Sequence, residues 1–210
     1  MQLHWSILLC IIGAYFLGSV PTSVWIGKIF FGVDIRQHGS GNAGATNALR
    51  VLGVKTGVIV LLLDVLKGVA AVALGWLVAG YFYNPDFFSG FQLLLGMIAL
   101  FGHVFPVFAG FRGGKGVATL TGVVAVMFPL AFLICLGVFL ALFVSTGYVS
   151  LGSIAASIVL PLAIILITGP TSPAGIVFSC IVALLVPLSH KQNILRLLKG
   201  TENRISFRKN

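Results

Sequence analysis

The 30-residue run VATLTGVVAVMFPLAFLICLGVFLALFVST, residues 117–146, decides how the chain folds. A helix that crosses a bilayer needs about 20 apolar residues, so this run is long for one crossing. Pro129 lies near its middle, and proline ends or kinks a helix because it lacks an N–H group. We therefore predict a short helix over 117–128, a turn at Pro129, and a helix over 130–146 that returns across the membrane.

The composition is that of a polytopic membrane protein. Of the 210 residues, 59% are hydrophobic and 8% are charged, whereas about a quarter of the residues in a soluble domain are charged. A single membrane domain over residues 1–210 is therefore expected. No soluble domain fits between the further apolar runs, which occupy residues 4–31, 53–83, 88–110, 150–168 and 174–189.

The charged residues and the cysteines limit which partners and which metal or disulfide sites the protein can have. The net charge of +9 would suit nucleic acid or an anionic surface, but basic residues in a membrane protein first mark its cytoplasmic loops. Anionic substrates are a second, compatible explanation, and we expect no nucleic-acid partner. Cys10, Cys135 and Cys180 lie in apolar runs without paired spacing, which indicates small hydrophobic side chains and not metal ligands or disulfides.

Basic residues between the runs determine the expected topology. They gather in residues 32–52, 111–116 and 190–210, which should all face the cytoplasm. An even number of crossings must then separate the last two stretches, and the split at Pro129 supplies it. The sequence therefore predicts an all-α polytopic membrane protein with seven transmembrane helices, its N-terminus outside and its C-terminus cytoplasmic. Five spans with a re-entrant piece are the alternative.

The polar stretch HGSGNAGATN, residues 38–47, contrasts with its apolar surroundings. It matches G-x-G-x-x-G formally, but a dinucleotide site also needs a preceding strand and a later acid, and the flanks here are membrane helices. Glycines instead let backbone N–H groups form a concave nest that binds anions. We interpret the stretch as an anion site, with a flexible loop as the alternative. Donors and charge would come from its polar members and two neighbouring arginines: Ser40, Asn42, Thr46, Asn47, Arg36 and Arg50.

A second polar stretch, GHVFPVFAGFRGGKGVAT, occupies residues 102–119. Its GGKG is similar to a Walker loop, but Ala109 and Gly116 stand where that motif requires a glycine and a hydroxyl. A turn that starts the next helix could still hold phosphate through the helix N-terminus and the Lys115 ammonium. The alternative is a tight turn in a positively charged loop.

A third polar stretch, SHKQNILRLLKGTEN, occupies residues 189–203. His190, Asn193 and Arg196 are three residues apart and share one helix face, which could line a site at the membrane boundary. The alternative is an amphipathic helix on the bilayer surface, with its basic residues solvated.

Single polar residues in the apolar runs each allow two interpretations. Intramembrane charges are costly and are usually paired, so Asp64 and Lys67 form either a structural pair or part of a site. His103, at the end of a run, fits a structural or interfacial residue better than a catalytic one. Ser150 is either a donor or a helix cap.

The scarcity of acids limits the chemistry. Four acidic residues occur, no two of them close in sequence, so the carboxylate-rich site of a two-metal phosphotransferase is not easily built. No histidine is followed five positions later by aspartate, as the H-x-x-x-x-D acyltransferases require, and no G-x-S-x-G elbow occurs. We therefore expect phosphate chemistry without a metal or another cofactor.

Taken together, the three polar stretches resemble a known family. GSVPTSVWIGKIFFGVDIRQHGSGNAGATNALR (18–50), GHVFPVFAGFRGGKGVAT (102–119) and HKQNILRLLKGTE (190–202) closely resemble the three signatures of the bacterial acyl-phosphate:glycerol-3-phosphate acyltransferases of the PlsY type. The resemblance extends across essentially the whole chain. Its combination of GSGNAGATN with GGKGVAT is far more specific than any single motif above.

The resemblance implies an activity. Enzymes of this family transfer a fatty acyl group from acyl-phosphate to the 1-hydroxyl of sn-glycerol 3-phosphate, which yields lysophosphatidic acid and phosphate. This is the first acylation of phospholipid synthesis. A multi-pass enzyme of the bacterial cytoplasmic (inner) membrane, surrounded by membrane lipids and with its active site facing the cytoplasm, is therefore expected. The sequence does not reveal acyl-chain preference or oligomeric state.

The resemblance also implies roles for individual residues. His190 would deprotonate the glycerol hydroxyl, unless a substrate phosphate takes that proton. Catalytic roles fall on His190, Lys115 and Ser40. Substrate-binding roles fall on Gly41, Asn42, Thr46, Asn47, Arg50, Gly113, Gly114, Ser150 and Asn193.

Two other protein classes share some of these features. A transporter or channel for a phosphorylated metabolite would also have basic loops and intramembrane charges, but it predicts an internal repeat and polar residues near mid-membrane. We find no repeat, and the polar stretches fall on one predicted face. A structural membrane subunit would leave all three stretches unexplained.

Overall fold

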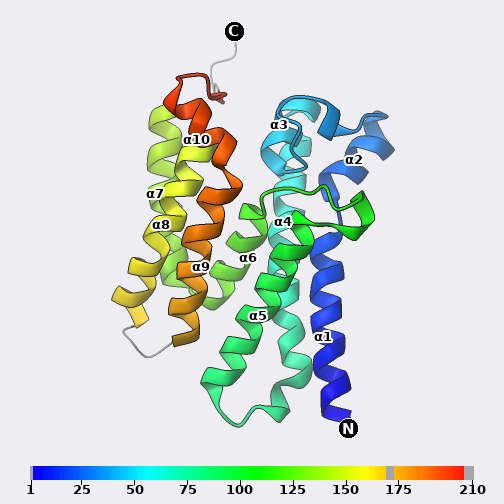
Figure 1. Cartoon of the computed structure of the whole chain (residues 1–210), viewed down its shortest axis with the longest axis vertical. Helices are drawn as coiled ribbons and strands as arrows, with labels where there is room; N and C mark the ends of the chain where they lie inside the picture. The colour runs from blue at the N-terminus through cyan, green and yellow to red at the C-terminus, as the bar shows by residue number, and fades with distance from the viewer. Residues whose placement is uncertain (1, 169–172, 206–210) are drawn as a thin grey trace. The chain divides into compact units, whose positions relative to one another are not determined.

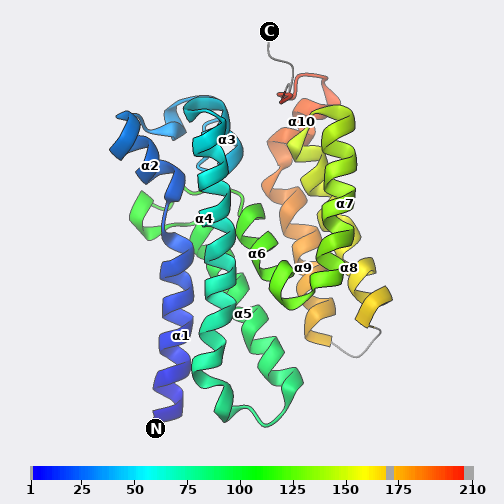
Figure 2. The same ribbon diagram turned by 180° about the vertical axis from the view of Figure 1, so that it is seen from behind.

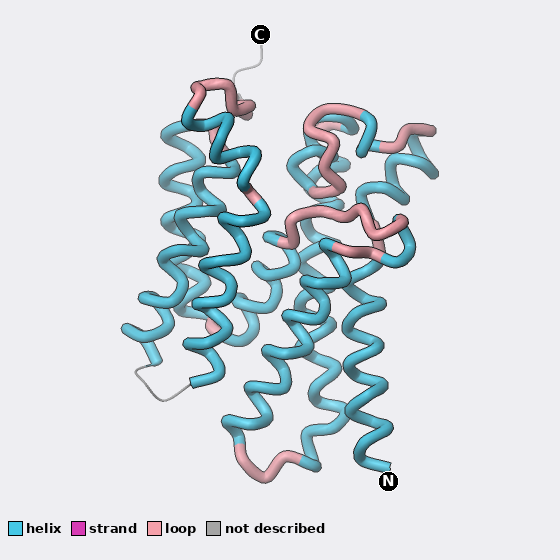
Figure 3. The backbone as a smooth tube through the Cα atoms, viewed as in Figure 1, coloured by secondary structure: helices cyan, strands magenta, loops and turns pink. Residues whose placement is uncertain are grey.

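The computed structural model describes residues 2–168 and 173–205. Within these residues the regular structure is helical and no strand occurs (Figure 3), which confirms the all-α part of the prediction. The chain divides into two compact units, Met1–Met127 and Phe128–Asn210, and each is described by itself. The expectation of one domain over residues 1–210 stays a prediction.

The first unit is a bundle of long helices that carries two shorter helices at one end. The start of α1 and the turn before α5 lie at one end of this unit, whereas α2 and α3 lie at the other (Figures 1 and 2). Short 3-10 turns cover Ile35–Gln37, Leu74–Tyr81 and Val107–Ala109. The α-helices are α1 (Gln2–Ser19), α2 (Thr22–Phe31), α3 (Ala45–Leu52), α4 (Val54–Ala73), α5 (Pro85–Val104) and α6 (Val117–Met127).

Helix α4 has its polar side inside and its apolar side outside. Asp64 and Lys67 are buried on the face that packs in the bundle. Leu62 and Leu66, on the opposite face, are 57% and 56% exposed. Charges that face the bundle and leucines that face outward are typical of a helix surrounded by lipid.

Glycines let the helices of this unit approach closely. A Cβ atom on Gly68 of α4 would overlap the carbonyl oxygen of Thr119 in α6, and a Cβ on Gly122 would overlap that of Val65. Small residues at helix crossings are common in membranes, where van der Waals packing replaces the hydrophobic effect between helices. The α4–α6 contact therefore depends on both glycines.

The apolar run 4–31 is not one helix. Helix α1 ends at Ser19, and α2 begins at Thr22 with a bend of 44° between them. Pro21 stands at the break, where its ring and missing N–H group prevent a continuous helix. The break was not among the sequence predictions, although Pro21 was its signal.

The predicted split of residues 117–146 is confirmed. Helix α6 ends at Met127 and α7 begins at Pro129, one residue from each predicted boundary. Proline suits the first turn of a helix because the N–H group that it lacks would have no partner there. Pro129 therefore ends one helix and begins the next.

The second unit contains three apolar helices and a short polar one. Helix α7 packs on α8, and α8 packs on α9. The axis turns by 61° between α9 and α10. The bounds are Pro129–Thr146 for α7, Val149–Thr168 for α8, Pro173–Ser189 for α9 and Lys191–Leu198 for α10.

The number of membrane crossings is only partly determined. Among the described residues, four helices are long and apolar enough to cross, or up to six if the bent pairs α1–α2 and α9–α10 each count as one span. Helix α6 has 11 residues and is about 16 Å long, roughly half the thickness of the hydrocarbon core. The predicted count of seven and the orientation of the termini are therefore not confirmed.

Substitution of either glycine at the α4–α6 contact is expected to destabilise the first unit. Gly68→Ala or Gly122→Ala places a methyl group on a backbone carbonyl, and overpacking of this kind costs about 1–3 kcal/mol. Thermal unfolding in detergent measures the effect. Gly137→Ala in α7 is the control, because a Cβ there meets nothing within 4 Å. Equal midpoints for all three variants would contradict the packing described.

Candidate active site

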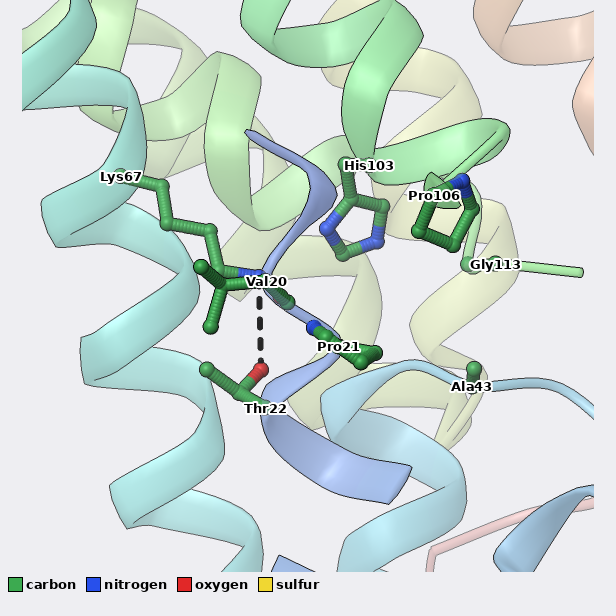
Figure 4. A pocket seen from close by; sticks show the side chains of 9 residues that line it. Val20, Pro21, Thr22, Ala43, Lys67, His103, Pro106 and Gly113 are labelled. Carbon is green, nitrogen blue, oxygen red and sulfur yellow. Dashed lines mark hydrogen bonds between the residues drawn. The ribbon is translucent and has the colours of Figure 1, made fainter. Parts of the chain in front are cut away.

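The two glycine-rich loops of the first unit meet at one pocket. It is small, with a cavity volume of about 10 Å³, and opens beside the break between α1 and α2 (Figure 4). One lining residue, Ala43, belongs to the first polar stretch, and four belong to the second: His103, Pro106, Gly113 and Gly114. The structure thus brings these two stretches together. The lining residues are Val20, Pro21, Thr22, Ala43, Lys67, His103, Pro106, Gly113 and Gly114.

Asn47 organises the first loop from inside. Its Oδ1 accepts a hydrogen bond from the Ser40 N–H at 2.8 Å, and its Nδ2 donates to the carbonyls of Ile35 at 2.9 Å and His38 at 3.1 Å. The side chain is buried, and both of its N–H groups are used within the loop. Asn47, predicted to bind substrate, therefore holds the loop in shape.

The rest of the loop leads into the N-terminus of α3. Gly41 has a φ of +71°, a left-handed conformation that glycine adopts without strain. Ser40 and Gly41 are exposed, and Asn42 and Thr46 are half-buried. The first N–H groups of a helix have no partner within the helix, so the start of α3 beside these residues suits an anion. Arg50 is half-buried one turn further along α3.

The glycines of the second loop pack tightly on the end of α5. The Gly113 N–H donates to the carbonyl of Val104 at 3.1 Å, and the Gly114 N–H donates to that of His103 at 3.2 Å. A Cβ on Gly113 would overlap the His103 carbonyl oxygen. These two N–H groups are thus used in the turn, and the substrate-binding role expected of Gly113 and Gly114 stays a prediction. Lys115 follows at once and is half-buried.

Arg36 ties the two loops together. Its guanidinium donates to both carboxylate oxygens of Asp34, at 2.9 and 2.7 Å. Its Nη1 donates to the carbonyls of Ala109 at 2.7 Å and Arg112 at 3.4 Å, in the second loop. The hydrogen bonds from Arg36 hold the pKa of the Asp34 carboxyl well below its ordinary value. Arg36 therefore acts as a fixed link between the loops and not as a free substrate ligand.

A buried polar centre lies beside the pocket and consists of Thr22, Asp64, Lys67, His103 and Thr119. Asp64 Oδ1 lies 2.6 Å from Lys67 Nζ and accepts a hydrogen bond from Thr22 Oγ1 at 2.5 Å. Lys67 also donates to the carbonyl of Val20 at the helix break. His103 Nδ1 lies 3.3 Å from Thr119 Oγ1 and 3.8 Å from Asp64 Oδ1. Figure 4 shows Thr22, Lys67 and His103 around the pocket.

This centre bears on the interpretations that the sequence left open. Asp64 and Lys67 do form an ion pair, and Lys67 also lines the pocket. His103 was expected to be structural or interfacial, yet it too lines the pocket. The signal for this part of the site was the pair of charges within an apolar run, because such charges need partners from neighbouring segments.

In the second unit, Glu202 joins two of the predicted substrate-binding residues. Its Oε1 accepts hydrogen bonds from Ser150 Oγ at 2.9 Å and Asn193 Nδ2 at 2.6 Å, and its Oε2 accepts one from Arg196 Nε at 2.8 Å. Burial alone would raise the pKa of Glu202, but these hydrogen bonds together lower it below its ordinary value. No sequence pattern had singled out Glu202, although it ends the third family signature.

His190 is held at the junction of α9 and α10. It is buried, and its Nδ1 lies 2.8 Å from the carbonyl oxygen of Val186 and 3.1 Å from Ser189 Oγ. When the Nδ1 proton is donated to the Val186 carbonyl, Nε2 is the basic nitrogen of the ring. The geometry thus orients the imidazole that the sequence had proposed as a base.

Comparison with known proteins identifies the family. The family model for glycerol-3-phosphate acyltransferase matches residues 8–200. The chain belongs to the glycerol-3-phosphate acyltransferase family. Glycerol-3-phosphate acyltransferases of Chlorobaculum tepidum and Halalkalibacterium halodurans are 43% and 46% identical to it. These matches cover 98% of this chain and 99% of the first relative, and 100% of this chain and 98% of the second.

Solved structures agree with this assignment. The acyltransferase is similar to the crystal structure of PlsY (YgiH), an integral membrane glycerol 3-phosphate acyltransferase, in its glycerol 3-phosphate form, with a TM-score of 0.85. The lysophosphatidic acid form of that protein matches with a TM-score of 0.81. Both are 40% identical and cover 96% of each chain. The acyltransferase is thus an integral membrane enzyme of phospholipid synthesis, which excludes the transporter and the structural subunit.

Removal of the Arg36 link is expected to impair activity more than stability. In Arg36→Met the two loops lose their charge-assisted hydrogen bonds, and we expect kcat/KM for glycerol 3-phosphate to fall by about tenfold or more. Lys28→Met is the matched control, because Lys28 contacts the same Asp34 at 3.4 Å but is 55% exposed. Equal kinetics of the two variants would contradict a special role for the hydrogen bonds from Arg36 to the second loop.

The Glu202 cluster is expected to make stability fall in acid. Because folding lowers the pKa of Glu202 from its ordinary 4.5, its contribution is complete above that pH and is lost as the pH falls below it. Glu202→Gln should therefore lower the thermal midpoint near pH 7, and the difference from the wild type should shrink near pH 4. Asp86→Asn, an exposed acid outside the cluster, is the control. A constant difference across this pH range would contradict the expectation.

Proposed function

We propose that the chain transfers a fatty acyl group from acyl-phosphate to the 1-hydroxyl of sn-glycerol 3-phosphate, which forms lysophosphatidic acid and phosphate. The observation that carries the proposal is the meeting of the two glycine-rich loops at one pocket. One loop leads to Arg50 and the other to Lys115, so two anion subsites lie on neighbouring loops. Two phosphate-bearing substrates require two such subsites. The two ligand forms of PlsY contain this acceptor and this product.

The choice of donor follows from chemistry and from the family resemblance. Acyl-phosphate is a mixed anhydride with phosphate as a good leaving group. The glycerol 1-oxygen attacks the acyl carbon, the bond from that carbon to the phosphate oxygen breaks, and phosphate departs. The protein's contribution is then to hold two anions close together in a partly dry site. No residue here is required to form a covalent intermediate, and neither a metal nor another cofactor enters the proposal.

The first unit supplies the phosphate contacts in this proposal. Ser40, Gly41, Asn42 and Thr46, with the N-terminus of α3, bind a substrate phosphate, and Arg50 neutralises it. Asn47 contributes by keeping the Ser40 segment in place. Gly113 and Gly114 contribute by allowing the second loop to lie flat on α5. Lys115 offsets the negative charge that develops on the departing phosphate.

The family resemblance assigns acceptor contacts to residues that lie in the second unit. Ser150 and Asn193 are oriented by Glu202 and bind the acceptor. His190 takes the proton of the 1-hydroxyl on Nε2, or a substrate phosphate takes it and His190 positions the acceptor. These roles rest on the match of this sequence to the family signatures.

The membrane arrangement is also part of the proposal. Seven segments lie in the bilayer of the bacterial cytoplasmic membrane, with α6 as a short one, the N-terminus outside and the C-terminus inside. The glycine-rich loops and α10 then face the cytoplasm. The basic residues of both regions favour this side. The acyl tail of the donor can remain in lipid while both phosphates stay at the interface.

The test is acyl transfer by the purified protein in detergent. Acyl-phosphate and glycerol 3-phosphate should yield lysophosphatidic acid and phosphate in equal amounts, measured by mass spectrometry and phosphate release. Lys115→Met should lower kcat by about 10²–10³-fold, as removal of a charge-stabilising group does. Lys199→Met, at an exposed lysine after α10, should have little effect.

Further arms of the same assay separate the alternatives. Turnover with acyl-CoA or acyl-carrier-protein thioesters, but not with acyl-phosphate, would overturn the proposed donor. His190→Gln with near-normal turnover and an unchanged pH profile would assign the proton to a substrate phosphate. No product with any donor, alongside an active control enzyme, would overturn the proposed function as a whole.

A further inference from the structure

His103 lies directly beneath the turn that precedes Lys115. It is the next-to-last residue of α5 and is 7% exposed. A Cβ on Gly114 would overlap His103 Nε2 and lie 3.2 Å from its Cδ2. The carbonyl of the same histidine accepts the Gly114 N–H at 3.2 Å. Gly114 therefore contacts both the ring and the backbone of His103.

The opposite edge of the ring is held from two other helices. Nδ1 lies 3.3 Å from the hydroxyl of Thr119, in the first turn of α6, and 3.8 Å from the Asp64 carboxylate of α4. Asp64 itself is fixed by Thr22 and Lys67. The ring consequently has little freedom to shift toward or away from the loop.

Lys115 lies between the two segments that this ring touches. Gly114, immediately before it, rests on Nε2, and Thr119, four residues after it, lies beside Nδ1. A displacement of the ring would move both flanks of Lys115 together. Among the described residues, no other side chain of the buried polar centre contacts both Gly114 and Thr119.

We infer that His103 is a positioning residue for Lys115. Because Gly114 has no side chain, the loop can pack directly on the His103 ring, and the ring fixes the position of the loop. The inference rests on the proposed function, because that function assigns the Lys115 ammonium to the departing phosphate. His103 acts through the loop and not by contact with the reacting atoms. Asp64 and Thr119 act one step further away, by holding the ring.

A double-mutant cycle between positions 103 and 114 tests this contact. Gly114→Ala should lower kcat by about ten- to a hundredfold, because its methyl group collides with the ring. His103→Asn removes the ring and should lower kcat by itself, because the loop loses its support. In the double variant, Gly114→Ala should cost much less, since the ring overlap is gone and the nearest remaining atom is the Ala43 carbonyl oxygen at 3.3 Å.

Gly113→Ala is the matched control. Its Cβ would overlap the backbone carbonyl of His103, which no substitution of the side chain removes. This variant should therefore lose the same factor in both the wild-type and the His103→Asn background. Thermal midpoints of all variants, measured in the same detergent, distinguish loss of folding from displacement of the loop.

A second readout does not depend on turnover. The rate at which an amine-reactive ester labels Lys115, measured by mass spectrometry relative to Lys199, should change in His103→Asn and in Gly114→Ala. Equal costs of Gly114→Ala in both backgrounds, or an unchanged labelling ratio, would overturn the inference. If the wild type transfers no acyl group, the proposed function fails, whereas the labelling ratio still decides whether His103 sets the environment of Lys115.

Discussion

The first unit depends on a buried ion pair between Asp64 and Lys67. Asp64 and Lys67 lie on the buried face of a helix whose other face is leucine-rich, and charges in such surroundings are costly unless neighbouring groups satisfy them. The partners come from other segments: the Val20 carbonyl and the Thr22 hydroxyl at the α1–α2 break. These hydrogen bonds to the two charges therefore hold the helix break against the middle of α4.

Acid–base pairs recur elsewhere in the part of the chain that the structure describes. Among the described residues, three of the four acids are paired with a base: Asp34 with Arg36, Asp64 with Lys67, and Glu202 with Arg196. Each pair holds a loop or a helix end in place. The excess of basic residues, 13 against four acids, gives the chain its net charge of +9.

Local signals in the sequence were sufficient for much of the fold. Proline at position 129 and the length of its run predicted two helices, and the spacing of Asp64 and Lys67 suggested a pair. Contacts between residues that are distant in sequence could not be predicted from such local signals. His103 and Glu202 acquire their roles from residues that are distant in sequence, and no local pattern distinguishes a histidine beneath a loop from one at a membrane interface.

The hydrogen bonds of Asn47 have a consequence for chemical ageing of the protein. Its amide accepts at one end and donates twice at the other, so its nitrogen and oxygen are not interchangeable. Deamidation would exchange the donating nitrogen for an oxygen that faces the carbonyls of Ile35 and His38, and two attractions would become repulsions. An aspartate of almost identical shape would thus disrupt the loop, because the direction of its donors matters more than its volume.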